Sequence, residues 1–230
     1  MRDLVTYINE GFKLGKNKVK KVEEDFVDLD LPSGTLWCKY NVGATCESNA
    51  KSWYGDYFMW GDPEPATNRE CSWRNYKYCN GESLTKYCPD DKIDDWGGKG
   101  NPDNKLVLDL EDDMANVNMG EDWKMPSQEQ FEELINNTKH IWVKNYNDIQ
   151  GLNGRLFISE TNDNELFMPA AGYQHALFAR LVGSNVRLWS SVLSDDCPNY
   201  ASNLHSNSIS TFPNNHSFRN CGFPVRGVMS

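Results

Sequence analysis

The stretch Trp123-Lys-Met-Pro-Ser-Gln-Glu-Gln-Phe-Glu-Glu-Leu-Ile135 predicts a turn followed by a capped amphipathic helix. Ser127 and Gln130 have the spacing of a capping box, in which the serine hydroxyl accepts a backbone N–H and the glutamine side chain reaches back to the N-cap amide. The apolar residues that follow fall on one helical face, which is expected to point into the core: Phe131, Leu134 and Ile135. The rest of the chain can be interpreted outward from this helix.

Another helix is expected before this stretch, and short strands dominate after it. The helical spacing of Leu110, Met114 and Val117 predicts a helix that ends at Gly120. The strands expected further along are Trp142 to Tyr146, Gly154 to Ser159, Glu165 to Met168, Leu188 to Val192, Tyr200 to Leu204, Ile209 to Phe212 and Phe223 to Val228. Near the N-terminus, the residues from Phe26 to Trp37 predict two strand segments joined by a Pro-Ser-Gly turn. Two helices with many short antiparallel strands indicate an α+β fold.

The composition is that of a globular protein. Of the 230 residues, 39% are hydrophobic and 24% are charged, so a sizeable core can form in one large domain or two small ones. The apolar runs are far shorter than the roughly 18 residues of a membrane-spanning helix, and the first ten residues lack the apolar segment of a secretory signal. The net charge of −10 argues against nucleic acid as a partner. We therefore expect neither membrane insertion nor signal-dependent export of this chain.

Seven cysteines are spread along the chain without a disulfide or zinc-binding pattern. Their number is odd, and no Cys-x-x-Cys pair occurs. The spacing of Cys71, Cys79 and Cys88 does not match a zinc site. We therefore expect mostly reduced thiols, no structural metal and no cofactor.

Two segments stand apart from the predicted core. A short N-terminal helix is expected, with an apolar stripe of Leu4, Ile8 and Phe12. A run of lysines follows it, which fits either a solvated linker or an electrostatic attachment segment. Because so short a helix is marginal alone, we interpret residues 1–25 as an attachment helix and basic linker. Residues 66–104 are polar and rich in Asn, Asp, Gly and Tyr, which predicts a long insertion loop.

Seven motifs resemble one protein family in their order along the chain. They are Val27-Asp-Leu-Asp-Leu-Pro-Ser-Gly-Thr-Leu-Trp37, Asn41-Val-Gly-Ala44, Tyr54-Gly-Asp-Tyr-Phe-Met-Trp-Gly61, Asp122-Trp-Lys-Met-Pro126, Phe167-Met-Pro-Ala-Ala-Gly172, Leu188-Trp-Ser-Ser191 and Gly222-Phe-Pro-Val-Arg226. From about residue 26 onward, the chain resembles the C-type-lectin-fold domain common in gut bacteria and their phages, which is similar to the formylglycine-generating, sulfatase-modifying superfamily. Within that family it resembles variable proteins of diversity-generating retroelements. The resemblance implies two helices, a twisted antiparallel sheet that joins the termini, and a second small sheet whose loops display a ligand-binding face.

The resemblance also implies a genetic device that leaves a trace in composition. In such proteins, adenines in AAC and AAT codons near the 3′ end are randomised, and the resulting codons never encode Lys, Glu, Gln, Met or Trp. These five types make up 48 of the 230 residues, yet none occurs in the 39 residues between Trp189 and Met229, a gap that 39 independent draws would give roughly once in ten thousand trials. Because ordinary surface loops favour Lys and Glu, the gap supports a variable region near residues 173–221.

The predicted ligand-binding residues lie in this region. Strand alternation places Leu204 on one face of its strand and Asn203, His205 and Asn207 on the other, which is expected to face solvent. A polar face without a ligand fits the same pattern. Because Tyr and Arg serve as anchors and Asn and Ser as adaptable hydrogen-bonding groups, we predict a ligand-binding site of Tyr173, His175, Phe178, Arg180, Asn185, Arg187, Tyr200, Asn203, His205, Asn207, Asn214, His216, Arg219 and Asn220. Phe178 would be an anchor if exposed and a core residue if buried.

Other motif residues are expected to be structural. Arg226 is a predicted ion-pair partner, and four tryptophans are predicted core residues: Trp37, Trp60, Trp123 and Trp189. Cys197 and Cys221 are too far apart to be the copper-binding pair that the resemblance implies for sulfatase-modifying relatives. No Walker, Gly-x-Ser-x-Gly, His-Glu-x-x-His or Gly-x-Gly-x-x-Gly motif occurs either. We therefore expect no catalytic activity and no functional metal.

The resemblance implies a non-enzymatic ligand-binding display protein with a diversified C-terminal face. We expect it on a phage virion, attached to other virion proteins through residues 1–25, with a protein or glycan of the host surface as its ligand. Self-association stays open. The alternatives are a binding protein of the bacterial surface or cytosol, a static structural decoration of the virion and, last, a degenerate oxidase-like enzyme.

Overall fold

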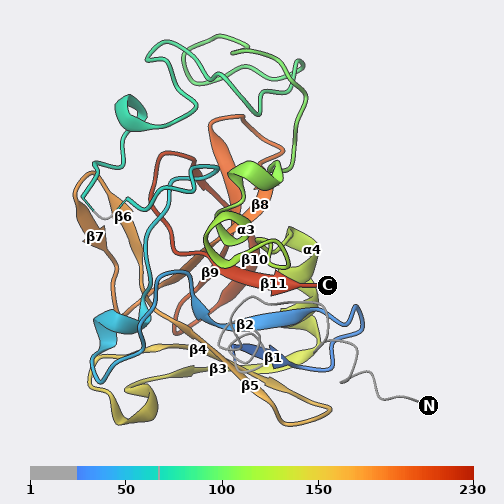
Figure 1. Cartoon of the computed structure of the whole chain (residues 1–230), viewed down its shortest axis with the longest axis vertical. Helices are drawn as coiled ribbons and strands as arrows, with labels where there is room; N and C mark the ends of the chain where they lie inside the picture. The colour runs from blue at the N-terminus through green and yellow to red at the C-terminus, as the bar shows by residue number, and fades with distance from the viewer. Residues whose placement is uncertain (1–24, 67) are drawn as a thin grey trace, which may run out of the picture.

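The computed structural model describes residues 25–66 and 68–230, which form two α-helices and eleven strands (Figure 1). The helices are α3 (Met114–Met119) and α4 (Gln128–Asn136). The strands are β1 (Phe26–Asp28), β2 (Leu36–Asn41), β3 (Thr138–Val143), β4 (Gly154–Ser159), β5 (Glu165–Pro169), β6 (Tyr173–His175), β7 (Phe178–Arg180), β8 (Val186–Leu193), β9 (Tyr200–Ser206), β10 (Thr211–Phe218) and β11 (Arg226–Met229). The predicted α+β class is confirmed. The predicted N-terminal helix lies outside the described residues.

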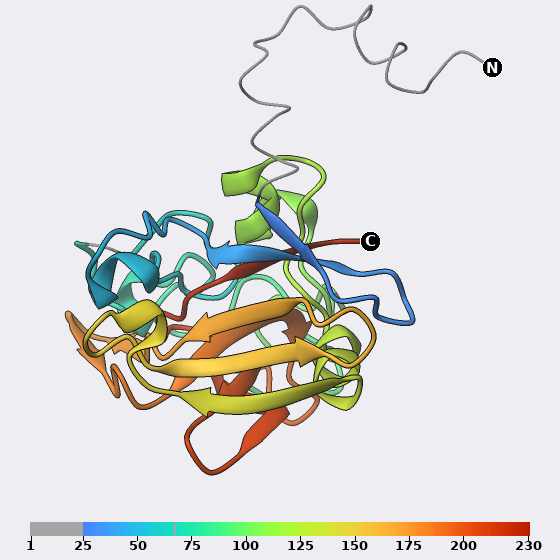
Figure 2. The same ribbon diagram turned by 90° about the horizontal axis from the view of Figure 1, so that it is seen from below.

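The strands pair antiparallel in four small sheets. One sheet has the order β1-β2-β11 and places the C-terminal strand beside the first described strands, as Figures 1 and 2 show. The others have the orders β10-β9-β8 and β3-β4-β5, and β6 and β7 form a separate hairpin. In Figure 1 the β8–β10 sheet lies between the β3–β5 sheet below and the loops after residue 66 above.

The sequence located most strands but misjudged several of their ends. Strand β4 has the predicted bounds, Gly154–Ser159. Strand β3 begins earlier than predicted, at Thr138, because it follows α4 directly and pairs along β4. Strand β10 continues beyond its predicted end to Phe218, because a register shift between Phe212 and Asn215 lets the chain pass a proline and resume pairing.

Helix α4 forms as its capping signal predicts. Ser127 Oγ accepts the Gln130 N–H at 3.3 Å, and Gln130 Oε1 accepts the Ser127 N–H at 2.9 Å. Its apolar face packs over β8, β9 and β10. Phe131 and Leu134 are fully buried there, and the Phe131 ring lies 5.6 Å from that of Trp37.

Helix α3 is shorter than predicted because Asp113 caps it. Asp113 Oδ1 accepts the N–H groups of Ala115 and Asn116 at 2.9 and 3.0 Å, so the helix starts after residue 113. Leu110 lies in a preceding 3-10 turn and is exposed. Gly120 ends the helix as predicted, with a φ of 115° that favours glycine.

The four tryptophans predicted for the core are buried there: Trp37, Trp60, Trp123 and Trp189. Two of these indole groups also fix the chain. Trp189 donates its ring N–H to the Phe58 carbonyl at 2.8 Å, and Trp60 donates to the Ser190 carbonyl at 2.9 Å. Because buried indoles need an acceptor, these two bonds hold the segment around residue 60 against β8.

Arg226 is not the ion-pair partner that we predicted. It is fully buried, and its guanidinium donates to Asn41 Oδ1 at 3.0 Å, to the Cys38 carbonyl at 2.8 Å and to the Phe167 carbonyl at 3.1 Å. Burial lowers its pKa to about 10. Neutral acceptors on β2 and β5 take the place of a carboxylate, so Arg226 ties three strands together.

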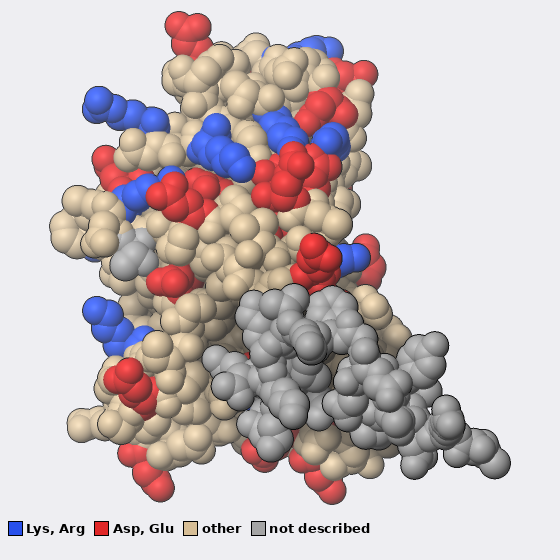
Figure 3. Space-filling view, viewed as in Figure 1, with Lys and Arg blue, Asp and Glu red and all other residues tan. Residues whose placement is uncertain are grey.

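The described residues of the 66–104 insertion form a long loop that has its own packing. Tyr76, Leu84 and Tyr87 are buried within the largest apolar cluster. Acidic and basic side chains alternate on the outer surface of this part, in the upper half of Figure 3. The insertion therefore belongs to the core of the molecule on one side and to its charged surface on the other.

All seven cysteines lie in the described residues and are free thiols. Burial raises the pKa of Cys71 to about 12 and that of Cys221 to about 11. Of the helices that the structure describes, none combines the length and apolar character needed to cross a bilayer.

Candidate functional site

The fourteen predicted site residues fall into three groups by exposure. The exposed ones are His175, Phe178, Arg180 and Asn214. The half-buried ones are Tyr173, Asn185, Arg187, Tyr200, His205, Asn207 and His216. The buried ones are Asn203, Arg219 and Asn220. Phe178 is 62% exposed, which excludes the core alternative for this side chain.

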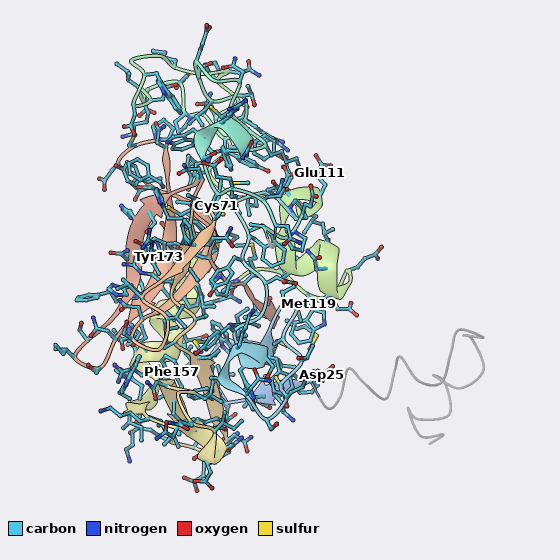
Figure 4. All side chains as sticks on the ribbon, turned by 90° about the vertical axis from the view of Figure 1, so that its left-hand side faces the viewer. Asp25, Cys71, Glu111, Met119, Phe157 and Tyr173 are labelled. Atoms are coloured by element: carbon cyan, nitrogen blue, oxygen red, sulfur yellow. The ribbon has the colours of Figure 1, made fainter. Side chains whose placement is uncertain are left out.

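Four predicted residues line one pocket: Tyr173, Arg187, Tyr200 and His216. The pocket lies between the β6–β7 hairpin and the β8–β10 sheet and has a volume of about 310 Å³. The other lining residues are Leu181, Ser217, Phe218, Cys221 and Phe223. Figure 4 turns this side of the molecule toward the viewer, with Tyr173 labelled beside the strands of the sheet. The volume is at the lower end of the range for small-ligand sites.

Two residues outside the predicted ligand-binding set hold the β6–β7 hairpin in place. Gly172 has a φ of +64°, and a Cβ atom there would overlap the Arg180 carbonyl, so only glycine permits this path into β6. Gln174 is buried, and its Nε2 donates to the carbonyls of Ala66 at 3.2 Å and Arg69 at 2.9 Å. The hairpin is therefore anchored to the insertion and forms a fixed wall of the pocket.

Aromatic rings form much of the pocket wall. Tyr200 and Phe218 are stacked with their centroids 4.4 Å apart, and Tyr173 meets Phe223 at 5.9 Å in an edge-on arrangement. Phe223 is in turn stacked on the buried Trp189 at 4.1 Å. Because this wall continues into the core, its shape is preorganised.

Arg187 supplies the positive charge of the pocket. Among the described residues that line it, Arg187 is the only Arg or Lys, and none is Asp or Glu. Its Nη1 lies 3.5 Å from Asn203 Oδ1 and 3.4 Å from Ser217 Oγ, both long contacts. Its Nε is buried and has no hydrogen-bond partner in the part of the chain that the structure describes. Burial lowers the pKa of Arg187.

Two histidines lie near this arginine. His205 in β9 pairs with Arg187 in β8. Burial, and to a smaller extent the positive charge of Arg187, lowers the pKa of His205 to about 4. It is therefore neutral at pH 7, and its Nε2 accepts a hydrogen bond from Asn185 Nδ2 at 2.7 Å. His216 Nδ1 lies 2.9 Å from the exposed Asp196 carboxylate. The Arg187 guanidinium thus lies beside a neutral imidazole ring.

The prediction of exposed ligand-binding side chains is wrong for Asn203 and Asn220. The predicted alternation of β9 does place Asn203 opposite Leu204, but β9 is the central strand of its sheet and both faces are covered. Asn203 pairs with Trp189, and its Nδ2 donates to the Asn215 carbonyl at 2.8 Å. Asn220 is 7% exposed in the turn after β10. Alternation predicts exposure only where one face of a sheet is open.

Arg219 is also wrongly predicted as a ligand-binding residue. It is fully buried and donates to Tyr76 Oη at 2.8 Å, the Pro198 carbonyl at 2.9 Å and the Lys86 carbonyl at 2.9 Å. Its guanidinium carbon lies 5.0 Å from the centroid of Trp60. Arg219 therefore joins the insertion to the end of β10 and cannot reach a ligand.

Asn207 closes a turn and does not line the pocket. Its Oδ1 accepts the N–H groups of Ile209 at 2.8 Å and Ser210 at 3.1 Å, between β9 and β10. This is the usual local hydrogen bonding of an Asx turn.

Phe218 and Phe223 are pocket residues that the sequence analysis missed. Phe218 lies beyond the predicted end of its strand, although Asn214, His216 and Phe218 have the period of two that would have included it. Phe223 belongs to a motif that we expected to be structural. One face of its ring stacks on the buried Trp189, as a structural role requires, but the side chain also lines the pocket.

Exposed apolar side chains cover the hairpin beside the pocket. We refer to Leu177, Phe178, Leu181 and Val182 as the hairpin rim; their exposed fractions are 64, 62, 49 and 42%. Arg180 lies 5.6 Å from the Phe178 ring centroid. Grouped exposed apolar residues usually mark an interaction surface.

Asp109, Glu111 and Asp112 are the one acidic group in the described residues that is close enough to hold a metal ion. Lys86 Nζ, however, lies 2.6 Å from both Asp109 Oδ2 and Asp112 Oδ2, and Lys77 Nζ lies 2.8 Å from Asp112 Oδ1. Burial would raise the pKa of Asp112, but the hydrogen bonds from the two lysines outweigh it and lower the pKa to about 2. Two ammonium groups thus occupy the cation position, and the group is an ion-pair network.

In comparisons of the chain with protein-family models, curated proteins and solved structures, no match is found.

Proposed function

We propose that this chain is a non-enzymatic ligand-binding protein with the C-type lectin fold, displayed on a phage virion. The observation that carries the proposal is the pocket, where predicted residues from β6, β8, β9 and β10 meet beside the exposed hairpin rim. A concave, largely aromatic site with a few polar groups is the usual form of a ligand-binding site. The two helices, the β1-β2-β11 sheet that pairs the first described strands with the last one, and the second sheet behind the pocket support the proposed fold.

The proposed diversified face consists of the predicted residues that reach the surface outside tight turns: Tyr173, His175, Phe178, Arg180, Asn185, Arg187, Tyr200, His205, Asn214 and His216. Asn203, Arg219 and Asn220 are left out, because random replacement of buried polar groups would strand their partners without hydrogen bonds. DNA sequencing downstream of the gene tests this. We expect a near-copy of its 3′ end beside a reverse transcriptase gene, with adenine-containing codons at surface positions and not at residue 219. A gene without such a copy would leave a static binding site.

Ligand binding is tested by adsorption of the labelled protein to host cells. Tyr200→Ala and Phe218→Ala remove the stacked wall of the pocket and are expected to weaken adsorption about 30-fold, as loss of a hot-spot aromatic does. Ile209→Ala is the matched control, because Ile209 is 92% exposed and does not line the pocket. Equal adsorption by all three variants would favour the alternative of a static virion decoration.

Attachment through residues 1–25 is the second part of the proposal. A deletion of residues 1–24 is expected to keep the melting temperature and the adsorption of the full chain, but to be missing from purified virions. Normal incorporation of the deletion variant would contradict attachment through this segment. Recovery of the full chain from bacterial envelopes or cytosol, and not from virions, would favour the alternative of a bacterial binding protein.

A further inference from the structure

We propose that the pocket takes up a carboxylate side chain of a partner protein, with Arg187 as the group that binds it. This inference rests on the proposed ligand-binding function and specifies the chemistry of the ligand. It is carried by the charge state of the pocket, the shape of the guanidinium group and the character of the surrounding surface.

Among the residues that the structure describes, none of those lining the pocket gives its cation, Arg187, an acidic partner. The guanidinium of Arg187 makes two contacts longer than 3.3 Å to neutral oxygens and lies 5.7 Å from the centroid of Phe223. Its Nε has no partner in the described residues although it is buried. A buried donor without a partner and a desolvated charge without an opposite charge are both costly. An anionic ligand group would relieve both, and exclusion of water by the ligand would strengthen the ion pair.

A carboxylate matches this site better than a phosphate. One planar guanidinium presents paired N–H donors that fit the two oxygens of a carboxylate. A phosphate carries more charge and a third oxygen, and the other described lining residues offer no second Lys or Arg to neutralise it. The aromatic walls formed by Tyr200 and Phe218 instead suit an apolar group next to the carboxylate.

The surface around the pocket favours a protein over an acidic sugar. The hairpin rim presents four exposed apolar side chains next to the pocket. An apolar surface around a buried arginine is typical of the centre of a protein interface. The hydroxyl groups of a sugar acid would lose water against this rim without gaining hydrogen bonds.

Small probes test the proposal on the full chain. The tripeptide acetyl-Phe-Glu-Phe-amide and its Gln counterpart are titrated into the protein while the Nε–H resonance of Arg187 is followed by NMR. A second acid and amide pair, 3-phenylpropionate and 3-phenylpropionamide, is titrated in the same way. Glucuronate is the sugar-acid probe. We expect the two non-sugar carboxylates to bind about 10- to 100-fold more tightly than their amides, the range for a charge-assisted hydrogen bond. Arg187→Gln should remove this difference.

The matched control is Arg74→Gln, which makes the same charge change at an exposed residue outside the pocket. Equal binding of acid and amide, or an equal effect of the two Arg variants, would overturn the carboxylate assignment. Binding of glucuronate without binding of the peptide would overturn the choice of a protein partner. If amide probes still bind and Phe218→Ala abolishes their binding, the proposed ligand-binding function stands and only the assignment of the ligand fails. If the variants have the melting temperature of the wild-type chain, unfolding is excluded as the cause of any loss of binding.

Discussion

Replacement of Arg219 by methionine gives the sharpest test of the structural role assigned to this residue. Methionine keeps an apolar stem of similar length but removes the guanidinium, which donates to Tyr76 Oη and to the carbonyls of Lys86, Tyr87 and Pro198. Because Arg219 is fully buried, no water replaces these donors without local opening.

The magnitude follows from these contacts. A hydrogen bond from a charged group contributes about 1.5 to 3 kcal/mol, and a buried acceptor left without a partner costs about 1 to 3 kcal/mol. The four bonds share one side chain and are not additive, and the acceptors near residue 86 can partly regain water because Lys86 is itself partly exposed. We therefore expect Arg219→Met to lower the free energy of unfolding by about 3 to 5 kcal/mol, the range for breaking a buried polar network.

Urea denaturation followed by tryptophan fluorescence measures this loss, since Trp60 lies against the Arg219 guanidinium. Arg74→Met is the control, because Arg74 is exposed and its replacement should change the free energy by less than about 0.5 kcal/mol. If Arg219→Met proved as stable as this control and lost ligand binding, Arg219 would be a ligand-binding residue after all, and its position in the structure would be refuted.

Three further predictions concern stability. Asp112→Asn should lower the free energy of unfolding by about 2 kcal/mol at pH 7, because the pKa of Asp112 falls from 3.8 to about 2 in the folded state. This stabilisation is complete above pH 3.8 and is lost as the pH falls toward 2, so the melting temperatures of variant and wild type should converge in acid. A gap between the two melting temperatures that stays constant with pH would contradict the ion-pair assignment. Folding lowers the pKa of His205 from 6.5 to about 4, so the folded state should lose stability as the pH falls from 6.5 to 4. His205→Gln should flatten the plot of melting temperature against pH in this range. An equally steep plot for the variant would show that another group is responsible. Leu204→Ala, which leaves a cavity against α4, should lower the free energy of unfolding measured by urea denaturation by about 2 to 5 kcal/mol. Replacement of the exposed Asn214 by Ala should lower it by less than about 0.5 kcal/mol. Similar losses for both variants would contradict the assigned faces of this sheet.

Local signals in the sequence predicted local structure well. The Ser127 and Gln130 pair predicted the start of α4, and the alternation around Leu204 placed Leu204 and Asn203 on opposite faces of β9. These signals succeeded because a capping box and a strand pleat depend on neighbours within a few residues. The end of β10 was missed, since polar residues and a proline interrupt the apolar pattern while the partner strand continues.

Burial of the polar site residues was decided by tertiary structure. Asn203 and Asn214 are chemically identical, yet one lies in the central strand beneath the pocket and the other on an exposed strand. Arg187 and Arg219 likewise differ through their surroundings: the first lies in an open pocket that none of its described lining residues provides with an acidic partner, and the second is enclosed by residues of the insertion.

The sequence by itself determined the α+β class, the position of the capped helix, the tryptophan core and the C-terminal region in which the pocket residues lie. Only the tertiary structure decided which of those residues meet, because Tyr173, Arg187, Tyr200 and His216 come from four different strands and are joined by long-range pairing. Whether a face of a strand is buried or exposed depends on the elements that pack on it, and the residue pattern of the strand alone does not specify these elements. Those elements, such as the insertion held by Arg219, come from distant parts of the chain, so their effect on exposure cannot be read from the strand alone.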